Sequence, residues 1–187
     1  APKGVMVEHR NVLNHAASMI AETGIGPGDR ILQFVSLSFD AAGEEFYPAL
    51  LSGATLALPG KAQALIGPEL PQFCAQYGVT LLHMPAAVWH TVIDDLLARE
   101  VGCPAPIRLL MLGGDAPDPA RLRAFGKMLG RDIPFLNLYG PTEATITTTL
   151  YRTTTAAPEG RLPIGRPVAN AAVYVLDKTG HPAPVGV

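Results

Sequence analysis

Short apolar runs alternate with longer amphipathic stretches along most of the chain. The amphipathic stretches place apolar residues three or four positions apart, which predicts helices, and the apolar runs between them are typical of buried strands. The predicted helices span 11–21, 42–51, 68–76, 86–98 and 119–129, and the predicted strands span 31–36, 55–58, 79–84, 107–112 and 134–138. Strict alternation of strands and helices favours a doubly wound α/β fold, with a mostly parallel sheet and helices on both faces.

The pattern changes near residue 145, where seven threonines crowd into residues 145–155. A loop rich in Pro and Gly follows, and the apolar run 172–176 then predicts another strand before a turn at 178–180. Strands joined by tight turns are typical of antiparallel sheets. We therefore expect an α/β subdomain over 1–150 and the first strands of a β-rich, barrel-like subdomain over 151–187.

Charge and composition exclude several classes of protein. The formal net charge is −2, which provides no basic surface for nucleic acid. No apolar run approaches the ~18 residues of a membrane span. Cys74 and Cys103 lack the spacing of a metal or redox motif, so we expect reduced cysteines in a cytoplasmic protein. The chain begins without Met and ends without a polar tail, which we interpret as a truncation at both ends.

Chemically versatile residues follow the predicted strands. In open α/β sheets, ligands bind beyond the carboxyl ends of the strands. Here these ends carry a carboxylate, an imidazole, paired glycines and an aromatic ring, in the segments 38–40, 83–85, 113–115 and 137–140. The sequence therefore predicts a crevice for a small molecule at this edge of the sheet.

The segment 137–146 reads Asn-Leu-Tyr-Gly-Pro-Thr-Glu-Ala-Thr-Ile. Thr142 can donate to a phosphate oxygen, and the Glu143 carboxylate suits a hard cation such as Mg²⁺. Tyr139 offers a face on which a flat ring can stack. The alternative is a purely structural turn, with Thr142 as a helix N-cap and Glu143 in the first turn of the helix.

The same segment resembles the YGPTE signature of adenylate-forming enzymes, and specifically of adenylation domains of nonribosomal peptide synthetases. Three further motifs of that family have counterparts in the same order along the whole chain. They are 2–5 with 8–11, 39–41 with 47–54, and 165–167 with 173–177 and 184–187. The resemblance implies a central fragment of the N-terminal core, with a flavodoxin-like α/β subdomain.

The resemblance also implies roles for individual residues. Asp40 is expected to bind the α-ammonium group of an amino acid, although it is also placed to act as a helix N-cap. Thr142 is expected to contact the α-phosphate of ATP, and Glu143 to ligate Mg²⁺. The rest of the ATP site is expected to comprise Lys3, Gly114, Asp115, Asn137, Tyr139 and Gly140.

Eight positions correspond to the family's pocket for the amino-acid side chain: Ala41, Glu44, His83, Met111, Gly113, Leu138, Ile146 and Thr147. A carboxylate in an apolar pocket is costly unless it meets a cation or a donor. Glu44 therefore predicts a polar or basic substrate side chain, unless it points outward from its helix. His83 either lines the pocket or is a core histidine.

The implied reaction joins an amino acid to ATP, which gives an aminoacyl-adenylate and pyrophosphate, and then passes the acyl group to a phosphopantetheine thiol. Implied partners are peptidyl carrier and condensation domains, and the implied product is an antibiotic or another secondary metabolite. The family's lid lysine and ribose-binding aspartate have no counterpart here, so we expect the fragment alone to be inactive. Alternatives are a fragment of an acyl-CoA or aryl-acid ligase, which Asp40 and Pro141 disfavour, and a non-catalytic folding or swap module.

Overall fold

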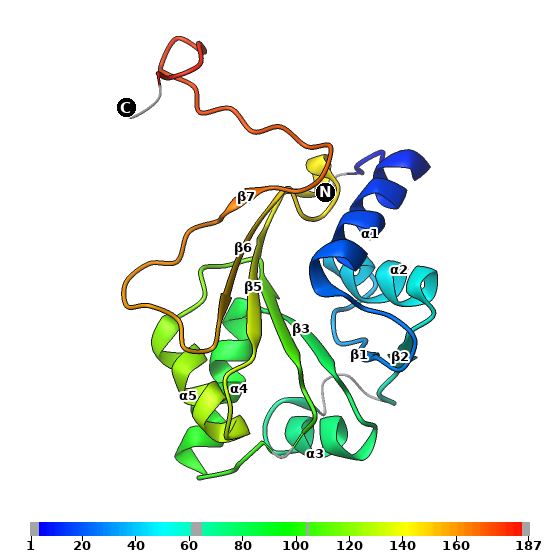
Figure 1. Cartoon of the computed structure of the whole chain (residues 1–187), viewed down its shortest axis with the longest axis vertical. Helices are drawn as coiled ribbons and strands as arrows, with labels where there is room; N and C mark the ends of the chain where they lie inside the picture. Colours follow the sequence, from blue (N-terminus) through cyan, green and yellow to red (C-terminus); the bar gives the residue numbers. More distant parts are fainter. Residues whose placement is uncertain (1–3, 61–64, 104, 185–187) are drawn as a thin grey trace.

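The computed structural model describes residues 4–60, 65–103 and 105–184. In these residues a seven-stranded sheet forms the centre of the fold (Figure 1). The strand order is β2-β1-β3-β4-β5-β6-β7; the first five strands are parallel, and β6 and β7 are antiparallel. The strands are β1 (Arg30–Leu32), β2 (Thr55–Ala57), β3 (Leu81–Pro85), β4 (Leu109–Gly113), β5 (Pro134–Tyr139), β6 (Thr149–Thr154) and β7 (Arg166–Pro167).

Five helices cover the sheet: α1 (His9–Thr23), α2 (Gly43–Ser52), α3 (Glu69–Gln76), α4 (Ala86–Ala98) and α5 (Pro119–Leu129). One apolar cluster joins α1 and α2 to one face of the sheet, and a larger one joins α3, α4 and α5 to the other (Figure 1). Successive strand residues alternate between the two clusters, as a pleated strand requires. Leu81 and Leu109 face α1 and α2, whereas Leu82 and Leu110 face α3, α4 and α5.

Local sequence explains why α5 matches its predicted bounds. The Asp118 side chain accepts a hydrogen bond from the Ala120 N–H, and Pro119 occupies the first turn of α5. Such a cap satisfies an otherwise unpaired donor at the start of a helix. At the other end, Gly130 adopts φ 70°, a left-handed conformation that ends many helices.

The chain order reverses between β1 and β3, which lie side by side at the centre of the 2-1-3-4-5 arrangement. Connections leave these two strands in opposite directions, so a crevice opens between them at the carboxyl ends. The doubly wound α/β prediction is confirmed. The order is also the flavodoxin-like one that the resemblance implied.

Two strand predictions were wrong. The strand expected over 31–36 ends at Leu32. Gln33 still donates to the Ala57 carbonyl of β2, but the N–H groups of Phe34 and Val35 donate to the Glu45 side chain of α2 instead of a neighbouring strand. The strand expected over 172–176 does not form. Only an isolated bridge joins Leu176 to Pro182, and the apolar side chains before it are exposed, since no strand in the described part of the chain lies beside them to pair with.

The antiparallel strands extend the parallel sheet directly. β6 pairs with β5 along its whole length, from Thr149 opposite Tyr139 to Thr154 opposite Pro134. The expected subdomain boundary at residue 150 falls inside β6, so the division into 1–150 and 151–187 stays a prediction.

None of the described helices is long and apolar enough to cross a membrane. Burial raises the pKa of the Cys74 thiol to about 12, which keeps this free cysteine protonated.

Candidate functional site

A pocket of about 460 Å³ opens at the carboxyl ends of β1 and β3, where the topology predicts a ligand. Its walls come from the segments that follow β1, β3, β4 and β5 and from the first turn of α2. Ten residues predicted from the sequence line it together: Asp40, Ala41, Glu44, His83, Gly113, Gly114, Leu138, Gly140, Ile146 and Thr147.

Other predicted residues lie around this pocket without lining it. Met111 is buried in the apolar cluster under α1 and α2. Asp115 and Tyr139 are exposed at the same edge of the sheet. The Asn137 side chain donates to the Pro163 carbonyl at 2.8 Å, which leaves its amide oxygen and one N–H for a contact with adenine. Lys3 lies outside the described residues.

Asp40 is the first residue of the short 3₁₀ helix η1 (Asp40–Ala42) and is exposed on the pocket wall. The N-cap of α2 is Ala42, and no side chain caps that helix. The interpretation of Asp40 as a helix N-cap was therefore wrong, because η1 continues directly into α2. Its carboxylate makes no capping hydrogen bond to the start of η1 or α2, and Asp40 lines the pocket.

Glu44 is buried, which contradicts the alternative that it points outward. One carboxylate oxygen, Oε2, lies 3.2 Å from Nε2 of His15 on α1, and the other, Oε1, accepts a hydrogen bond from Thr147. Burial alone would raise the pKa of Glu44, but His15, His83 and Thr147 together hold it below its usual range. The carboxylate thus has one hydrogen-bond donor, Thr147, and one basic neighbour, His15, within the chain, and the expectation of a polar or basic substrate side chain stays a prediction.

Glu45 supports the site and was missed by the sequence analysis. Its carboxylate accepts hydrogen bonds from the backbone N–H groups of Phe34 and Val35 at 3.1 Å and from the Gln33 side chain at 3.2 Å. It also lies 3.4 Å from Nδ1 of His83. Glu45 therefore holds the loop that leads to Asp40 and packs against His83 on the pocket wall.

His15 was also missed, although a signal for it exists. It falls on the same helical face as the apolar residues Val12, Ala16 and Met19, and it is buried there. A polar side chain on an apolar helical face needs a partner when it is buried. The position of His15 therefore indicates that this side chain has a buried polar partner, but the sequence alone does not identify Glu44 as that partner.

The loop between β5 and β6 is tightly closed. The Thr148 N–H donates to the Tyr139 carbonyl at 2.8 Å, and a Cβ atom on Gly140 would lie 2.3 Å from the Ile146 carbonyl oxygen. Thr145 and Ile146 both have positive φ, at 67° and 68°. This conformation is unfavourable for β-branched residues and tends to occur at functional sites. The loop thus presents Ile146 and Thr147 to the pocket in a fixed geometry.

Thr142 and Glu143 belong to a second 3₁₀ helix, η3 (Thr142–Ala144), whose N-cap is Pro141. The alternative role of Thr142 as an N-cap was therefore wrong. Glu143 is exposed and free to reach a ligand. Within the described residues no cluster of three or more His, Cys, Asp and Glu side chains is placed to hold a metal ion. A single carboxylate fits Mg²⁺ when substrate phosphates provide the other ligands.

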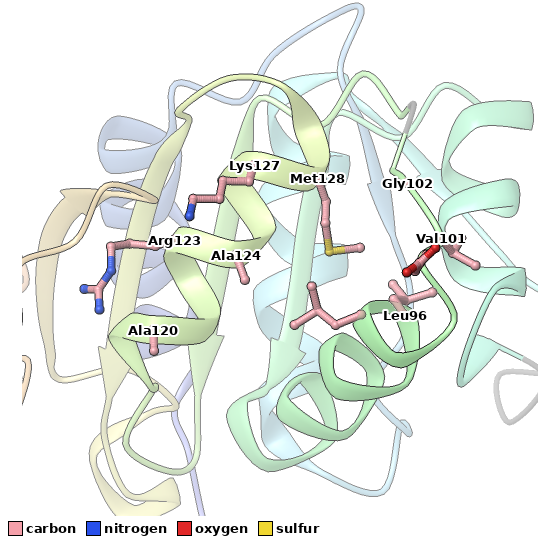
Figure 2. Close-up of a pocket in the computed structure, with 10 residues that line it drawn as sticks. Leu96, Val101, Gly102, Ala120, Arg123, Ala124, Lys127 and Met128 are labelled. Atoms are coloured by element: carbon pink, nitrogen blue, oxygen red, sulfur yellow. The ribbon is translucent and has the colours of Figure 1, made fainter.

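A larger hollow of about 570 Å³ lies between α4 and α5 (Figure 2). Leu96, Ala124 and Met128 form its apolar part, and Arg123 and Lys127 lie on α5 beside it (Figure 2). None of the residues predicted to carry chemistry lines this hollow, and it lies away from the carboxyl edge of the sheet. The pocket at β1 and β3 is therefore the candidate site.

The site combines an exposed carboxylate, glycines that admit a ligand close to the backbone, and a Thr-Glu pair beside an exposed aromatic ring. Together with the 2-1-3-4-5 sheet it defines an α/β protein with a small-molecule pocket at the carboxyl edge of its sheet. A family model described as AMP-binding enzyme matches residues 1–187. The chain belongs to this family.

Comparison with curated and solved proteins narrows the assignment to nonribosomal peptide synthesis. The chain is 40% identical over 186 residues to one of the linear gramicidin synthase proteins of Brevibacillus parabrevis, covering 100% of this chain and 3% of that protein. It is 32% identical to surfactin synthase subunit 2 of Bacillus subtilis, covering 99% of this chain and 5% of that protein.

Two solved structures share the fold. The adenylation domain AlmE of Vibrio cholerae, in complex with glycyl-adenosine-5'-phosphate, superposes with a TM-score of 0.81 at 25% identity, covering 98% of this chain and 35% of AlmE. The nonribosomal peptide synthetase FmoA3 superposes with a TM-score of 0.86 at 25% identity, covering 98% of this chain and 20% of FmoA3. The chain thus corresponds to a segment of an adenylation domain of a nonribosomal peptide synthetase, and it spans only a small part of these relatives.

Proposed function

We propose that the protein containing this chain activates an amino acid with ATP, forming an aminoacyl-adenylate and pyrophosphate. The observation that carries this proposal is the meeting, at one sheet edge, of the Asp40 carboxylate, the pocket and the Thr142–Glu143 pair. The AlmE complex, which holds a glycyl-adenylate in a similar fold, supports the same reaction class.

Each of the chain's residues has a proposed part in binding and alignment. Asp40 takes the α-ammonium group, because a carboxylate forms its strongest hydrogen bonds with charged donors. The substrate carboxylate is then directed toward η3, where Thr142 donates to the α-phosphate. Catalysis of such a transfer consists mainly of alignment and neutralisation of charge.

The adenine ring is proposed to lie between Gly114 and Tyr139. Gly114 has φ 80°, which favours glycine, and no side chain narrows the approach at this point. Tyr139 is 54% exposed at the end of β5 and offers its ring face. Asn137, Gly140 and Asp115 flank this slot, and Lys3 is proposed to face phosphate.

Mg²⁺ fits the arrangement, with Glu143 as its ligand from this chain. The ion supplies neutralisation of the phosphate charge. Glu143 is adjacent to Thr142 in η3 and lines a neighbouring cavity of about 370 Å³ beside the pocket. The exposure of Glu143 leaves the carboxylate free to serve this role.

The amino acid is proposed to move next to the phosphopantetheine thiol of a peptidyl carrier domain, with a condensation domain as a further partner. The homology to gramicidin and surfactin synthases supports this assignment. A fragment of an acyl-CoA or aryl-acid ligase is the alternative, and the free Asp40 carboxylate argues against it, since an acid without an amine provides no cation for it to bind.

The test is amino-acid-dependent exchange of pyrophosphate into ATP by the full-length protein that contains this chain. We expect exchange with at least one amino acid, and a loss of about 100-fold in the Glu143→Gln variant, typical of removing one charge-stabilising group. Glu159→Gln, an equivalent change in an exposed loop, is the control and should retain full exchange. Exchange with no amino acid, or only with carboxylic acids that lack an amine, would refute the proposal.

A further inference from the structure

A buried polar cluster separates the candidate pocket from α1. Glu44 and Thr147 belong to the pocket wall, whereas His15 lies behind them on α1 and does not line that pocket. A second cavity of about 370 Å³ lies on the far side and is lined by His15 and Thr147. The wall between the two cavities therefore depends on contacts among these three side chains.

One carboxylate oxygen of Glu44 is hydrogen-bonded within this cluster, and the other lies beside a basic ring. Oε1 accepts the hydroxyl hydrogen of Thr147, whereas Oε2 lies 3.2 Å from Nε2 of His15 without forming a hydrogen bond to it. His15 and Glu44 are each 2% exposed, so water does not compete strongly for either group. His15 is therefore the basic side chain that lies directly beside the buried carboxylate.

The remainder of the wall near Glu44 is largely apolar and includes Val35, Val88, Leu138 and Ile146. His83, which also lines this wall, lies 3.4 Å from Glu45. Glu45 in turn accepts hydrogen bonds from the N–H groups of the loop after β1. Asp40 is the exposed carboxylate of the pocket and is assigned to the α-ammonium group, so the part of the pocket near Glu44 offers the substrate side chain mainly apolar contacts.

We propose that His15 determines the selectivity of the pocket by occupying Glu44, so that the site accepts a neutral amino-acid side chain and rejects a basic one. This inference rests on the proposed function. His15 acts as a positioning residue, since it touches Glu44 and not the substrate. Glu44 without His15 would be a buried carboxylate in need of a cation, because an unpaired buried charge is strongly unfavourable.

Substitution of His15 by Leu is therefore expected to change substrate preference rather than simply weaken the enzyme. The apolar side chain fills similar space but leaves Oε2 of Glu44 without its basic neighbour. A lysine or ornithine ammonium group that enters the pocket can then compensate the charge of the Glu44 carboxylate from the pocket side. We expect the ratio of kcat/KM for ornithine to kcat/KM for leucine to rise about tenfold, which corresponds to about 1.4 kcal/mol.

The experiment measures pyrophosphate exchange by the full-length protein with leucine, valine, ornithine and lysine. Wild type should favour the neutral pair, His15→Leu should raise the ratio toward the basic pair, and His15→Leu with Glu44→Gln should return it to the wild-type preference. His9→Leu makes the same change at an exposed position of α1 and should leave the ratio unaltered.

Three results would overturn the inference: a wild-type preference for lysine or ornithine, an equal loss with all four amino acids in His15→Leu, or the same ratio shift in His9→Leu. Should His15→Leu not fold, the Glu44→Gln variant decides. Retention of the neutral preference supports the inference, and a change from basic to neutral preference contradicts it. Wild-type exchange with no amino acid refutes the proposed function itself, which distinguishes the two failures.

Discussion

Charged side chains have different roles at the two ends of the parallel sheet. At the amino end, Asp29 and Arg108 form a bidentate ion pair with distances of 2.8 and 2.7 Å. Thr80 donates to the same carboxylate at 2.8 Å, and Arg108 also donates to the carbonyls of Thr23 and Gly24 at the end of α1. These hydrogen bonds therefore connect separate elements of the fold.

At the carboxyl end, Asp40 and Glu143 are exposed, and no side chain caps η1, α2 or η3. The β5–β6 loop adds two strained residues at 145 and 146. The buried Glu44 and Glu45 connect elements at this end as well, but Asp40 and Glu143 add little stability and remain available to a ligand. The comparison shows a division between an edge that stabilises the fold and an edge that performs chemistry, a common arrangement in α/β proteins.

The strongest test of this division is Asp40→Asn, which removes a charge from the carboxyl end. We expect kcat/KM for the amino acid to fall about 100-fold, because a charge-assisted contact to the ammonium group is lost, while the melting temperature stays unchanged. Exchange kinetics and thermal melting of the full-length protein provide the two readouts.

A desamino analogue of the substrate provides the control for Asp40. Wild type should discriminate strongly between the amino acid and the analogue, and Asp40→Asn should discriminate little. Equal discrimination by both proteins would mean that Asp40 does not bind the amine, and the carboxyl end would then resemble the amino end more than we propose.

The converse test is Arg108→Met at the amino end. The loss of a bidentate ion pair and two bonds to carbonyls should lower the free energy of unfolding by about 1–3 kcal/mol, with KM values unchanged. Denaturant unfolding measures the effect. Arg30→Met, at the same edge but with a single long contact of 3.4 Å to the Tyr77 carbonyl, should cost less. Equal costs in the two variants would show that the ion pair adds nothing.

The smallest expected effect is a dependence of stability on pH. Hydrogen bonds from Arg108, Thr80 and the Gly26 N–H, against the opposing effect of burial, hold the pKa of Asp29 below its ordinary value of 3.8. A carboxyl group with a lowered pKa in the folded state stabilises the fold above that ordinary value and loses this contribution as the pH falls through the folded-state pKa. The difference in unfolding free energy between wild type and Asp29→Asn should therefore be full at about pH 6 and shrink below about pH 4. A difference that persists unchanged at low pH would contradict this.

Most of the fold was predictable because its signals are local. The helices at 86–98 and 119–129 match their predictions residue for residue. Each has one apolar face, and the second also has clear boundary residues in Asp118, Pro119 and Gly130. Strand ends were less predictable, because they depend on partners distant in sequence. The strand at 31–36 stops early on account of the Glu45 carboxylate, and nothing in residues 31–36 themselves indicates this.

The candidate site was predictable where it follows from strand ends and family motifs. Ten predicted residues share one pocket, including Asp40 and Thr147. The partners of buried polar groups were not predictable. His15 and Glu44 are 29 positions apart in the sequence, and only the packing of α1 against α2 brings them together. The expectation of a basic substrate arose from treating Glu44 without that partner.

The position of His15 also matters for exchanging substrate pockets between related synthetases. A transplanted segment that begins at Asp40 and ends at Thr147 would carry every predicted side-chain pocket residue, yet it would leave α1 behind. The incoming residue at position 44 would then meet the α1 side chain of the recipient instead of its own former neighbour. A graft intended to transfer selectivity should therefore begin before His9, so that both sides of the buried pair come from the same parent.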